Sequence, residues 1–285
     1  MTLSRHKSSL TIVTFIFIFL TTISLSFGQT KTEQLDKLLN TFTDYGQFNG
    51  SVLVAQEGKV IYKKGFGYAN MEWDIPNAAD TKFRLASVTK QFTGMLILQL
   101  AAEGKLDLHE PISTYLPEYN KANGDRITTH HLLTHSSGTP NYTSFPGFMQ
   151  DEVREPYTPE EFIKKFQDKD LDFTPGDRFS YSNSGYFLLG VIIEKLSGKS
   201  YEDMLHENIL KPLGMKNSGY DHFENVLKKR ATGYEKNGST VKNSRYLDMS
   251  IPYAAGSMYS TAEDLYLWDQ ALYTNKLLPL SLIHI

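Results

Sequence analysis

Two side chains with the chemistry of a serine nucleophile and its base stand three residues apart near the start of an apolar segment. They are Ser87 and Lys90, and the spacing places both on one face of a helix. A serine hydroxyl is a poor nucleophile until a neighbouring group accepts its proton, which a lysine amine can do. The first N–H groups of the helix would also stabilise a developing oxyanion. The pattern therefore makes Ser87 a candidate nucleophile and Lys90 its candidate base.

A second motif, Tyr181 with Asn183, combines a phenol and an amide two residues apart. It follows the turn-forming sequence Thr174-Pro175-Gly176 and precedes an apolar helix, so it lies on a loop of the kind that displays functional groups. Near a lysine ammonium, the Tyr181 phenol could act as a base. Asn183 could donate a hydrogen bond to a substrate carbonyl.

Each motif is weak when taken alone, because both patterns recur in the chain. The other occurrences are Ser4 with Lys7, Ser239 with Lys242, Tyr68 with Asn70, and Tyr273 with Asn275. Only Ser87 begins an apolar helix, and only Tyr181 stands between a turn and a helix. Context therefore selects one copy of each motif.

Three histidines, His130, His131 and His135, raise the alternative of a metal site, since positions 131 and 135 could share a helix face. They form no His-Glu-x-x-His arrangement, and no third ligand is evident. We therefore expect a structural role for this segment and neither a metal nor another cofactor.

Composition narrows the class of protein further. With 285 residues, 40% of them hydrophobic, the chain can bury a large core, and its net charge of −3 gives no basic stripe for nucleic acid. We expect a small or neutral substrate and no nucleic-acid partner. The absence of cysteine excludes a thiol nucleophile, thiolate metal ligands and disulfides.

The first 28 residues have the pattern of an export signal. Arg5 and Lys7 precede an apolar run over 10–27, and Ser26 and Gly28 supply the small residues of a cleavage site. A retained membrane anchor is the alternative, because the run approaches the length that spans a bilayer. We expect cleavage, no stable membrane insertion afterwards, and a periplasmic or secreted protein.

Periodicity predicts one helix over 33–42, followed by a hairpin of strands 50–56 and 59–64 around the turn Glu57-Gly58. Two strands do not form a stable sheet alone, so this hairpin needs partners from elsewhere in the chain. Further helices are expected over 87–103, 159–166, 185–196 and 201–209. Another should begin after Thr261, a good N-cap followed by two acidic residues.

The order of these segments resembles the serine β-lactamase and penicillin-binding family, in the branch that contains class C β-lactamases, D-alanyl-D-alanine carboxypeptidases and related esterases. The resemblance covers roughly 33–279. Its matching segments are FRLASVTK at 83–90, LLTHSSG at 132–138, FTPG at 173–176, YSNSGY at 181–186, LKPLGM at 210–215 and AGSMYS at 255–260. It implies an α/β (α+β) fold, with an antiparallel sheet flanked by helices and a mostly helical region.

The resemblance also implies roles for the motif residues. Ser87 would be acylated, Lys90 and Tyr181 would share the proton transfers, and Asn183 would position the substrate amide. The Ser87 N–H would form half of the oxyanion hole. The implied substrate is a D-alanyl peptide, a β-lactam or an ester, and the alternative is a non-catalytic protein that binds or senses penicillin or cell-wall peptide.

The family's third motif, a basic residue followed by Thr or Ser and Gly, does not follow Tyr181 in this sequence. The resemblance places that motif, with further strands and a final helix, beyond position 285. We therefore expect 29–285 to be a C-terminally truncated hydrolase domain that is inactive by itself. The last six residues, 280–285, equal one reading frame of a sequencing-library adaptor and are expected to be non-native.

The export signal makes a direct prediction. Secreted material should begin at Gln29, because small residues at 26 and 28 precede that bond. N-terminal sequencing of the exported protein measures this, and Met1 retained in a membrane fraction would instead support an anchor.

Overall fold

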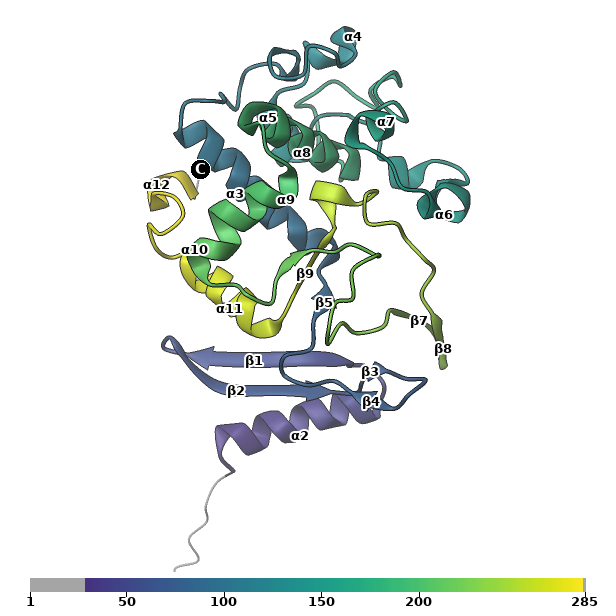
Figure 1. Cartoon of the computed structure of the whole chain (residues 1–285), viewed down its shortest axis with the longest axis vertical. Coiled ribbons are helices and arrows are strands. Elements are labelled where there is room, and N and C mark those ends of the chain that lie inside the picture. Colours follow the sequence, from purple (N-terminus) through teal and green to yellow (C-terminus); the bar gives the residue numbers. More distant parts are fainter. Residues whose placement is uncertain (1–28, 284–285) are drawn as a thin grey trace, which may run out of the picture.

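The computed structural model describes residues 29–283, in which a hairpin layer lies against a larger helical body (Figure 1). The predicted export signal falls outside the described residues and stays a prediction. At the N-terminal end, helix α2 (Lys31–Asp44) is followed by strands β1 (Gly50–Gln56) and β2 (Lys59–Phe66), which pair antiparallel. Thr30 caps α2 in a reciprocal arrangement with Glu33.

The partners of the hairpin are helices. Helix α2 lies along β2, where Asp36 accepts hydrogen bonds from Tyr62 and Lys64. On the other side lies α11 (Ala262–Ala271), whose Tyr266 donates to the Gly58 carbonyl at 2.8 Å. Among residues 29–283, no third strand pairs with β1 or β2. The hairpin was expected to need partners from elsewhere in the chain. Among the described residues these partners are the helices α2 and α11 and not further strands.

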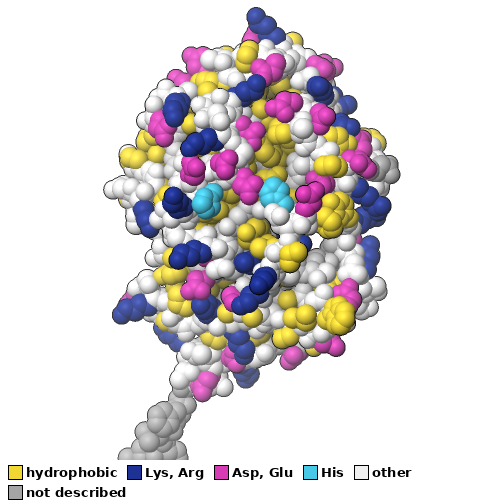
Figure 2. Space-filling model, viewed as in Figure 1, with side chains coloured by type: hydrophobic (Ala, Val, Ile, Leu, Met, Phe, Trp, Pro, Cys, Tyr) yellow, Lys and Arg dark blue, Asp and Glu magenta, His cyan; other side chains and the backbone are white. Residues whose placement is uncertain are grey.

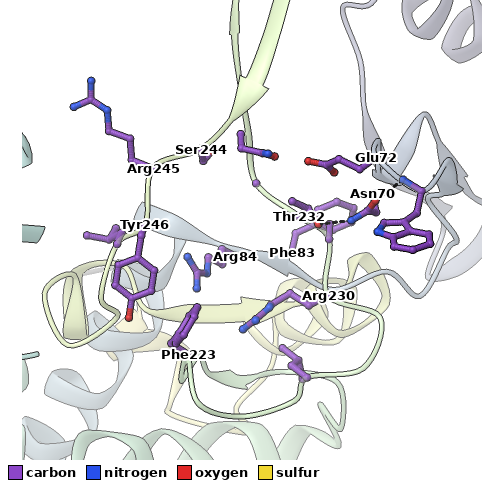
Figure 3. Close-up of a pocket in the computed structure, with 16 residues that line it drawn as sticks. Asn70, Glu72, Phe83, Arg84, Phe223, Arg230, Thr232, Ser244, Arg245 and Tyr246 are labelled. Atoms are coloured by element: carbon purple, nitrogen blue, oxygen red, sulfur yellow. Dashed lines mark hydrogen bonds between the residues drawn. The ribbon is translucent and has the colours of Figure 1, made fainter. Parts of the chain in front are cut away.

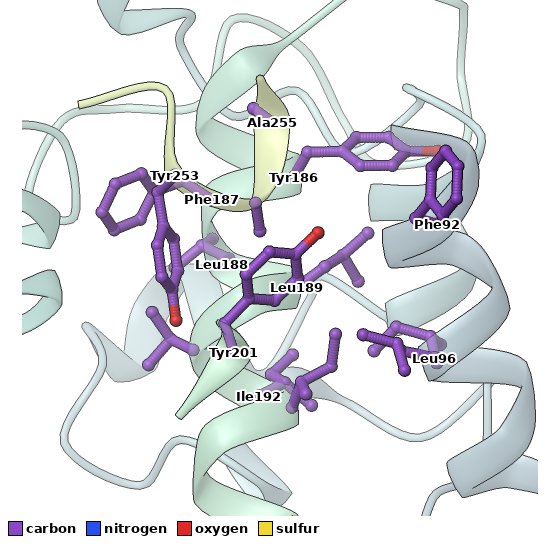
Figure 4. Packing of buried hydrophobic residues seen from close by; sticks show 14 of the residues in the cluster. Phe92, Leu96, Tyr186, Phe187, Leu188, Leu189, Ile192, Tyr201, Tyr253 and Ala255 are labelled. Carbon is purple, nitrogen blue, oxygen red and sulfur yellow. The ribbon is translucent and has the colours of Figure 1, made fainter. Parts of the chain in front are cut away.

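The helical body is built around α8 (Asn183–Ser197), which is buried continuously from Ser184 to Ile193. Its Phe187 stacks on Phe162, with ring centres 4.6 Å apart. The Phe187 ring also lies 4.8 Å from the Tyr253 ring (Figure 4). The other helices of the body are α3 (Thr89–Ala102), α4 (Lys121–Gly124), α5 (Thr129–Leu133), α6 (Phe148–Asp151), α7 (Pro159–Ile163), α9 (Tyr201–Leu205), α10 (Lys211–Leu213) and α12 (Leu280–Ile283).

Several helix boundaries differ from the predicted ones. The segment expected over 87–103 begins with a 3₁₀ turn, Ala86–Val88, before α3. The helix expected over 159–166 ends at Ile163 and continues as tighter turns. The helix expected over 201–209 becomes π-helical over His206–Leu210, because Pro212 lacks the N–H that would continue the α-helical pattern.

Short antiparallel strands connect the two layers. Strand β9 (Met258–Ser260) lies between β5 (Phe83–Arg84) and β6 (Gly219–Tyr220). Two further pairs are β3 (Tyr68–Asn70) with β4 (Ile75–Pro76) and β7 (Tyr234–Asn237) with β8 (Thr240–Asn243). The predicted fold class, antiparallel strands flanked by helices with a mostly helical region, is confirmed.

The surface seen in Figure 2 carries Lys and Arg side chains interspersed with Asp and Glu. Across the part of the chain that the structure describes, no helix combines the length and the apolar character needed to cross a bilayer.

The packing of α8 gives a stability prediction at Gly190. A Cβ there would lie 2.4 Å from the Tyr253 ring and 2.5 Å from the Ala254 Cβ. We expect Gly190→Ala to destabilise the protein by about 1–3 kcal/mol, although alanine is the better helix former.

Gly94→Ala in α3 is the matched control. The added Cβ would meet only Leu133, at 3.9 Å. The higher helix propensity of alanine should therefore stabilise this variant by up to about 1 kcal/mol. Urea unfolding measures the free energy of unfolding of both variants and of the wild type. Equal stability of the two would contradict the close packing of α8 on residues 253–255.

Candidate active site

Ser87 is presented by a constrained turn at the start of α3. The preceding residue, Ala86, has φ of +46°, a conformation that costs a non-glycine residue about 1–3 kcal/mol. The turn is held because Leu85 N–H donates to the Met258 carbonyl at 2.8 Å. Gly256 packs beside it, and an added Cβ there would be in ordinary van der Waals contact with the Ala86 carbonyl, at 3.7 Å from its carbon. Ser87 is therefore exposed on a rigid support.

The structure brings the three predicted catalytic side chains together. Tyr181 OH lies 2.7 Å from Ser87 Oγ, and Lys90 Nζ lies 3.3 Å from the same oxygen. The Lys90 amine also stands 4.8 Å from the centre of the Tyr181 ring. A phenol and an amine thus contact one hydroxyl, although 94 residues separate Ser87 from Tyr181 in the sequence.

The Lys90 amine is buried and has two further acceptors. It donates to Asn183 Oδ1 at 2.9 Å and to the Ala255 carbonyl at 2.8 Å, and the residue is only 7% exposed. Burial lowers the pKa of Lys90 from its ordinary value of 10.5 to about 8. Because Asn183 Oδ1 and the Ala255 carbonyl can only accept, the lone pair of the neutral amine is directed to Ser87.

Asn183 is the first residue of α8, which Ser182 caps through its hydroxyl. Its Oδ1 accepts from Lys90, while its backbone N–H and Nδ2 donate to Asn141 Oδ1 at 3.1 and 3.3 Å. The structure therefore places Asn183 as a direct partner of Lys90. Its predicted contact with a substrate amide stays a prediction.

The ring of His135 packs against the rings of Tyr181 and Tyr186. Its ring lies 4.4 Å from the Tyr181 ring and 5.0 Å from the Tyr186 ring, and its Nδ1 accepts the Ser182 N–H at 3.2 Å. Burial, and then the charge of Lys90, lower the pKa of His135 from 6.5 to about 4. A neutral ring also suits the hydrogen bond, because only unprotonated Nδ1 can accept.

The expectation that His131 and His135 could share a helix face is wrong. Helix α5 ends at Leu133, and His135 has φ of +55°, which turns the chain away from the helix axis. His131 instead caps α5 by accepting the Thr128 N–H. Over residues 29–283, no group of three His, Asp or Glu side chains is arranged to hold a metal ion.

The other copies of the two motifs are placed elsewhere. Ser239 lies in the turn between β7 and β8, and Lys242 pairs with Glu235 at 3.2 Å. Asn70 donates to Thr232, and Tyr273 is 66% exposed after α11. Ser4 and Lys7 fall outside the described residues.

Sequence reasoning gave no role to Asn141, to the Ala255 carbonyl or to the ring of His135. Asn141 and Ala255 carry no local signal, because an amide after a proline and a backbone carbonyl look ordinary in any sequence. His135 lies within a segment that resembles the family, but its contact with Tyr181 depends on tertiary packing.

Comparison with known proteins agrees with this geometry. The model of the family described as Beta-lactamase matches residues 35–282. The chain belongs to the beta-lactamase family. It is 34% identical over 249 residues to the putative penicillin-binding protein PbpX of Bacillus subtilis, covering 87% of this chain and 61% of PbpX. It therefore spans less than two thirds of that relative.

Solved structures of the family superimpose on the chain. The octameric penicillin-binding protein homologue from Pyrococcus abyssi matches with a TM-score of 0.75 and 33% identity, covering 88% of this chain and 58% of that one. The D-amino acid amidase from Ochrobactrum anthropi matches with a TM-score of 0.75 and 29% identity, covering 87% and 71%.

The low pKa of His135 predicts how stability depends on pH. Between about 6.5 and 4 the unfolded histidine binds a proton that the folded one does not, so the free energy of unfolding should fall as pH decreases through this range. We expect a loss on the order of 1–3 kcal/mol from this residue.

His135→Asn is the comparison variant, since asparagine tolerates positive φ and its Oδ1 can accept the Ser182 N–H. Denaturant unfolding at pH 7 and pH 4 measures the difference between the two proteins. An identical pH dependence of wild type and His135→Asn would contradict the assigned environment of the ring.

Proposed function

We propose that the chain is a serine hydrolase that forms an acyl intermediate on Ser87. The observation that carries the proposal is the convergence of Tyr181 OH and Lys90 Nζ on Ser87 Oγ, at 2.7 and 3.3 Å. A nucleophile in hydrogen-bond reach of its base, with the base oriented by a third group, is the arrangement that acyl transfer requires.

In the proposed acylation, neutral Lys90 accepts the Ser87 proton while Oγ attacks the substrate carbonyl carbon. The hydrogen bond from Tyr181 to Ser87 Oγ leaves the serine proton free to point at the lysine amine. As the tetrahedral intermediate collapses, the bond to the leaving group breaks. The proton that Lys90 holds passes through the Tyr181 hydroxyl to the departing nitrogen or oxygen.

The second half of the cycle reverses these roles. Water attacks the acyl carbon and gives a proton to the same pair of groups, and Ser87 Oγ leaves as the hydroxyl is restored. The Ser87 N–H, in the 3₁₀ turn that leads into α3, is the proposed oxyanion donor within this chain.

The proposed substrate is an acyl donor such as a D-alanyl peptide, a β-lactam or an ester. Similarity to penicillin-binding proteins and to a D-amino acid amidase supports a donor that carries a D-configured residue. We favour peptidase or esterase activity over a dedicated β-lactamase. We also propose export, with cleavage after Gly28. Export would bring the enzyme to a substrate outside the cytoplasm.

Covalent labelling tests the proposal. In the full-length protein, we expect a fluorophosphonate or a penicillin to add one adduct on Ser87, detected by intact-mass and peptide mass spectrometry, and to leave Ser87→Ala unlabelled. Lys90→Ala and Tyr181→Phe should fold but label about 10²- to 10⁴-fold more slowly, because base catalysis is removed.

The outcomes separate enzyme from binder. A penicillin adduct that forms and is then released by hydrolysis means turnover, whereas tight binding of cell-wall peptide without an adduct would favour the non-catalytic sensor. Ser239→Ala is the control, because it repeats the sequence pattern away from the site. Labelling that survives Ser87→Ala would show that another serine is the nucleophile.

A further inference from the structure

The structure contains a cavity of about 760 Å³, whose lining residues are drawn in Figure 3. Ser87, Lys90 and Tyr181 are not among the residues that line it. Its walls come from β3, β5, the segment before β7 and the segment after β8. The volume is within the range of sites that hold small molecules or short peptides.

One wall of the cavity is built from two arginines that share a buried carboxylate. Asp221 is 1% exposed, and its two oxygens accept from Arg84 Nε at 2.5 Å and from Arg230 Nη1 at 2.6 Å. Asp221 itself does not line the cavity, while Arg84 and Arg230 do. The carboxylate therefore fixes the two groups from behind.

This arrangement leaves N–H groups available on the cavity side. Arg84 donates to Asp221 through Nε alone, so its two terminal nitrogens keep their hydrogens, and Arg230 keeps Nε and its second terminal nitrogen. A guanidinium fixed in one orientation loses little entropy when it binds an anion in a bidentate way. Figure 3 shows Arg84 and Arg230 side by side, close to Phe223.

The charges around the cavity favour a ligand that carries one negative charge. A third arginine, Arg245, lines it, and the only carboxylate among its lining residues is Glu72. Glu72 is already engaged, because hydrogen bonds from Tyr234 and Asn243 lower its pKa. Three guanidinium groups against Glu72 and Asp221 leave a net charge of +1.

Aromatic side chains form another part of the wall. Trp73 and Phe223 line the cavity and are 79% and 56% exposed, although large aromatic groups are usually buried. Phe223 is held edge-on to Tyr246 at 4.7 Å. Flat apolar surface beside a fixed cation suits a ligand that combines a carboxylate with a planar or apolar group.

We propose that this cavity is a second binding site, which takes a monocarboxylate bearing a flat apolar group, such as an N-acylated amino acid or the end of a short peptide. Arg84 and Arg230 bind the carboxylate, and Trp73 and Phe223 cover the apolar part. The proposal does not depend on acylation of Ser87, because no residue of the catalytic group takes part.

Fluorescence titration tests the site, because Trp73 and Trp268 are the two tryptophans and Trp268 is 4% exposed against Phe92. Hippurate (benzoylglycine) is the probe, and neutral hippuramide is its matched control. We expect saturable quenching of the exposed tryptophan by hippurate and binding at least tenfold weaker for hippuramide, since the charge-assisted hydrogen bonds are lost.

Two variants test the arginines. Arg230→Gln keeps the Arg84–Asp221 pair and should weaken hippurate binding about tenfold, and Arg245→Gln, on an exposed segment, should weaken it less. Arg126→Gln removes a cation outside the cavity and should leave the affinity for hippurate unchanged.

Ser87→Ala should bind hippurate as wild type does, so failure of the proposed hydrolase activity and failure of this site are distinguishable. Equal affinity for hippurate and hippuramide, or unchanged binding in a folded Arg230→Gln variant, would overturn the proposal.

Discussion

Burying the Lys90 amine costs free energy unless each of its N–H groups finds an acceptor, and this constraint organises the surrounding structure. Two acceptors come from segments far apart in the sequence, Asn183 Oδ1 at the start of α8 and the Ala255 carbonyl before β9. Satisfying them fixes the amine beside Ser87. The same burial that makes the lysine costly lowers its pKa to about 8, close to the range in which it can act as a base.

The elements that supply those acceptors are themselves tied to α3. Thr93 donates to the Ala254 carbonyl at 2.6 Å, and Thr89 Oγ1 accepts the Met258 N–H at 3.2 Å, so buried hydroxyls connect the helix to residues 254–258. Gly190 in α8 allows the same segment to approach closely from the other side. The nucleophile, the amine and its acceptors are therefore held by one packed unit. Pre-organisation of this kind is how a site holds reacting groups in place at little entropic cost.

Many of the helices and strands could be predicted from the sequence, because the patterns that specify them are local. The hairpin, α2, α8 and the N-cap at Thr261 follow from periodicity, turn residues and capping. The convergence of Ser87, Lys90 and Tyr181 was expected from family resemblance and not from spacing, since the same short patterns recur elsewhere in the chain. Resemblance alone does not establish their roles.

Other features depend on tertiary packing and left no local signal. The strained turn at Ala86, the orientation of His135 and the contact of Asn141 with Asn183 arise only when distant segments meet. Helix ends were misplaced where a later residue decided the geometry, as Pro212 does for the π-helical segment. The paired arginines on Asp221 come from positions 84 and 230, so no sequence window contains them.

The pH dependence of Ser87 acylation tests most directly whether Lys90 is the base. In the full-length protein, the second-order rate constant for labelling by a fluorophosphonate should rise between pH 6 and pH 9, with a midpoint near 8, as the buried amine loses its proton. Lys90→Arg keeps the charge at every accessible pH, so its labelling should be slow and show no such rise. A wild-type rate constant that does not change over this range, or a Lys90→Arg variant with the wild-type profile, would contradict the assignment of Lys90 as the base.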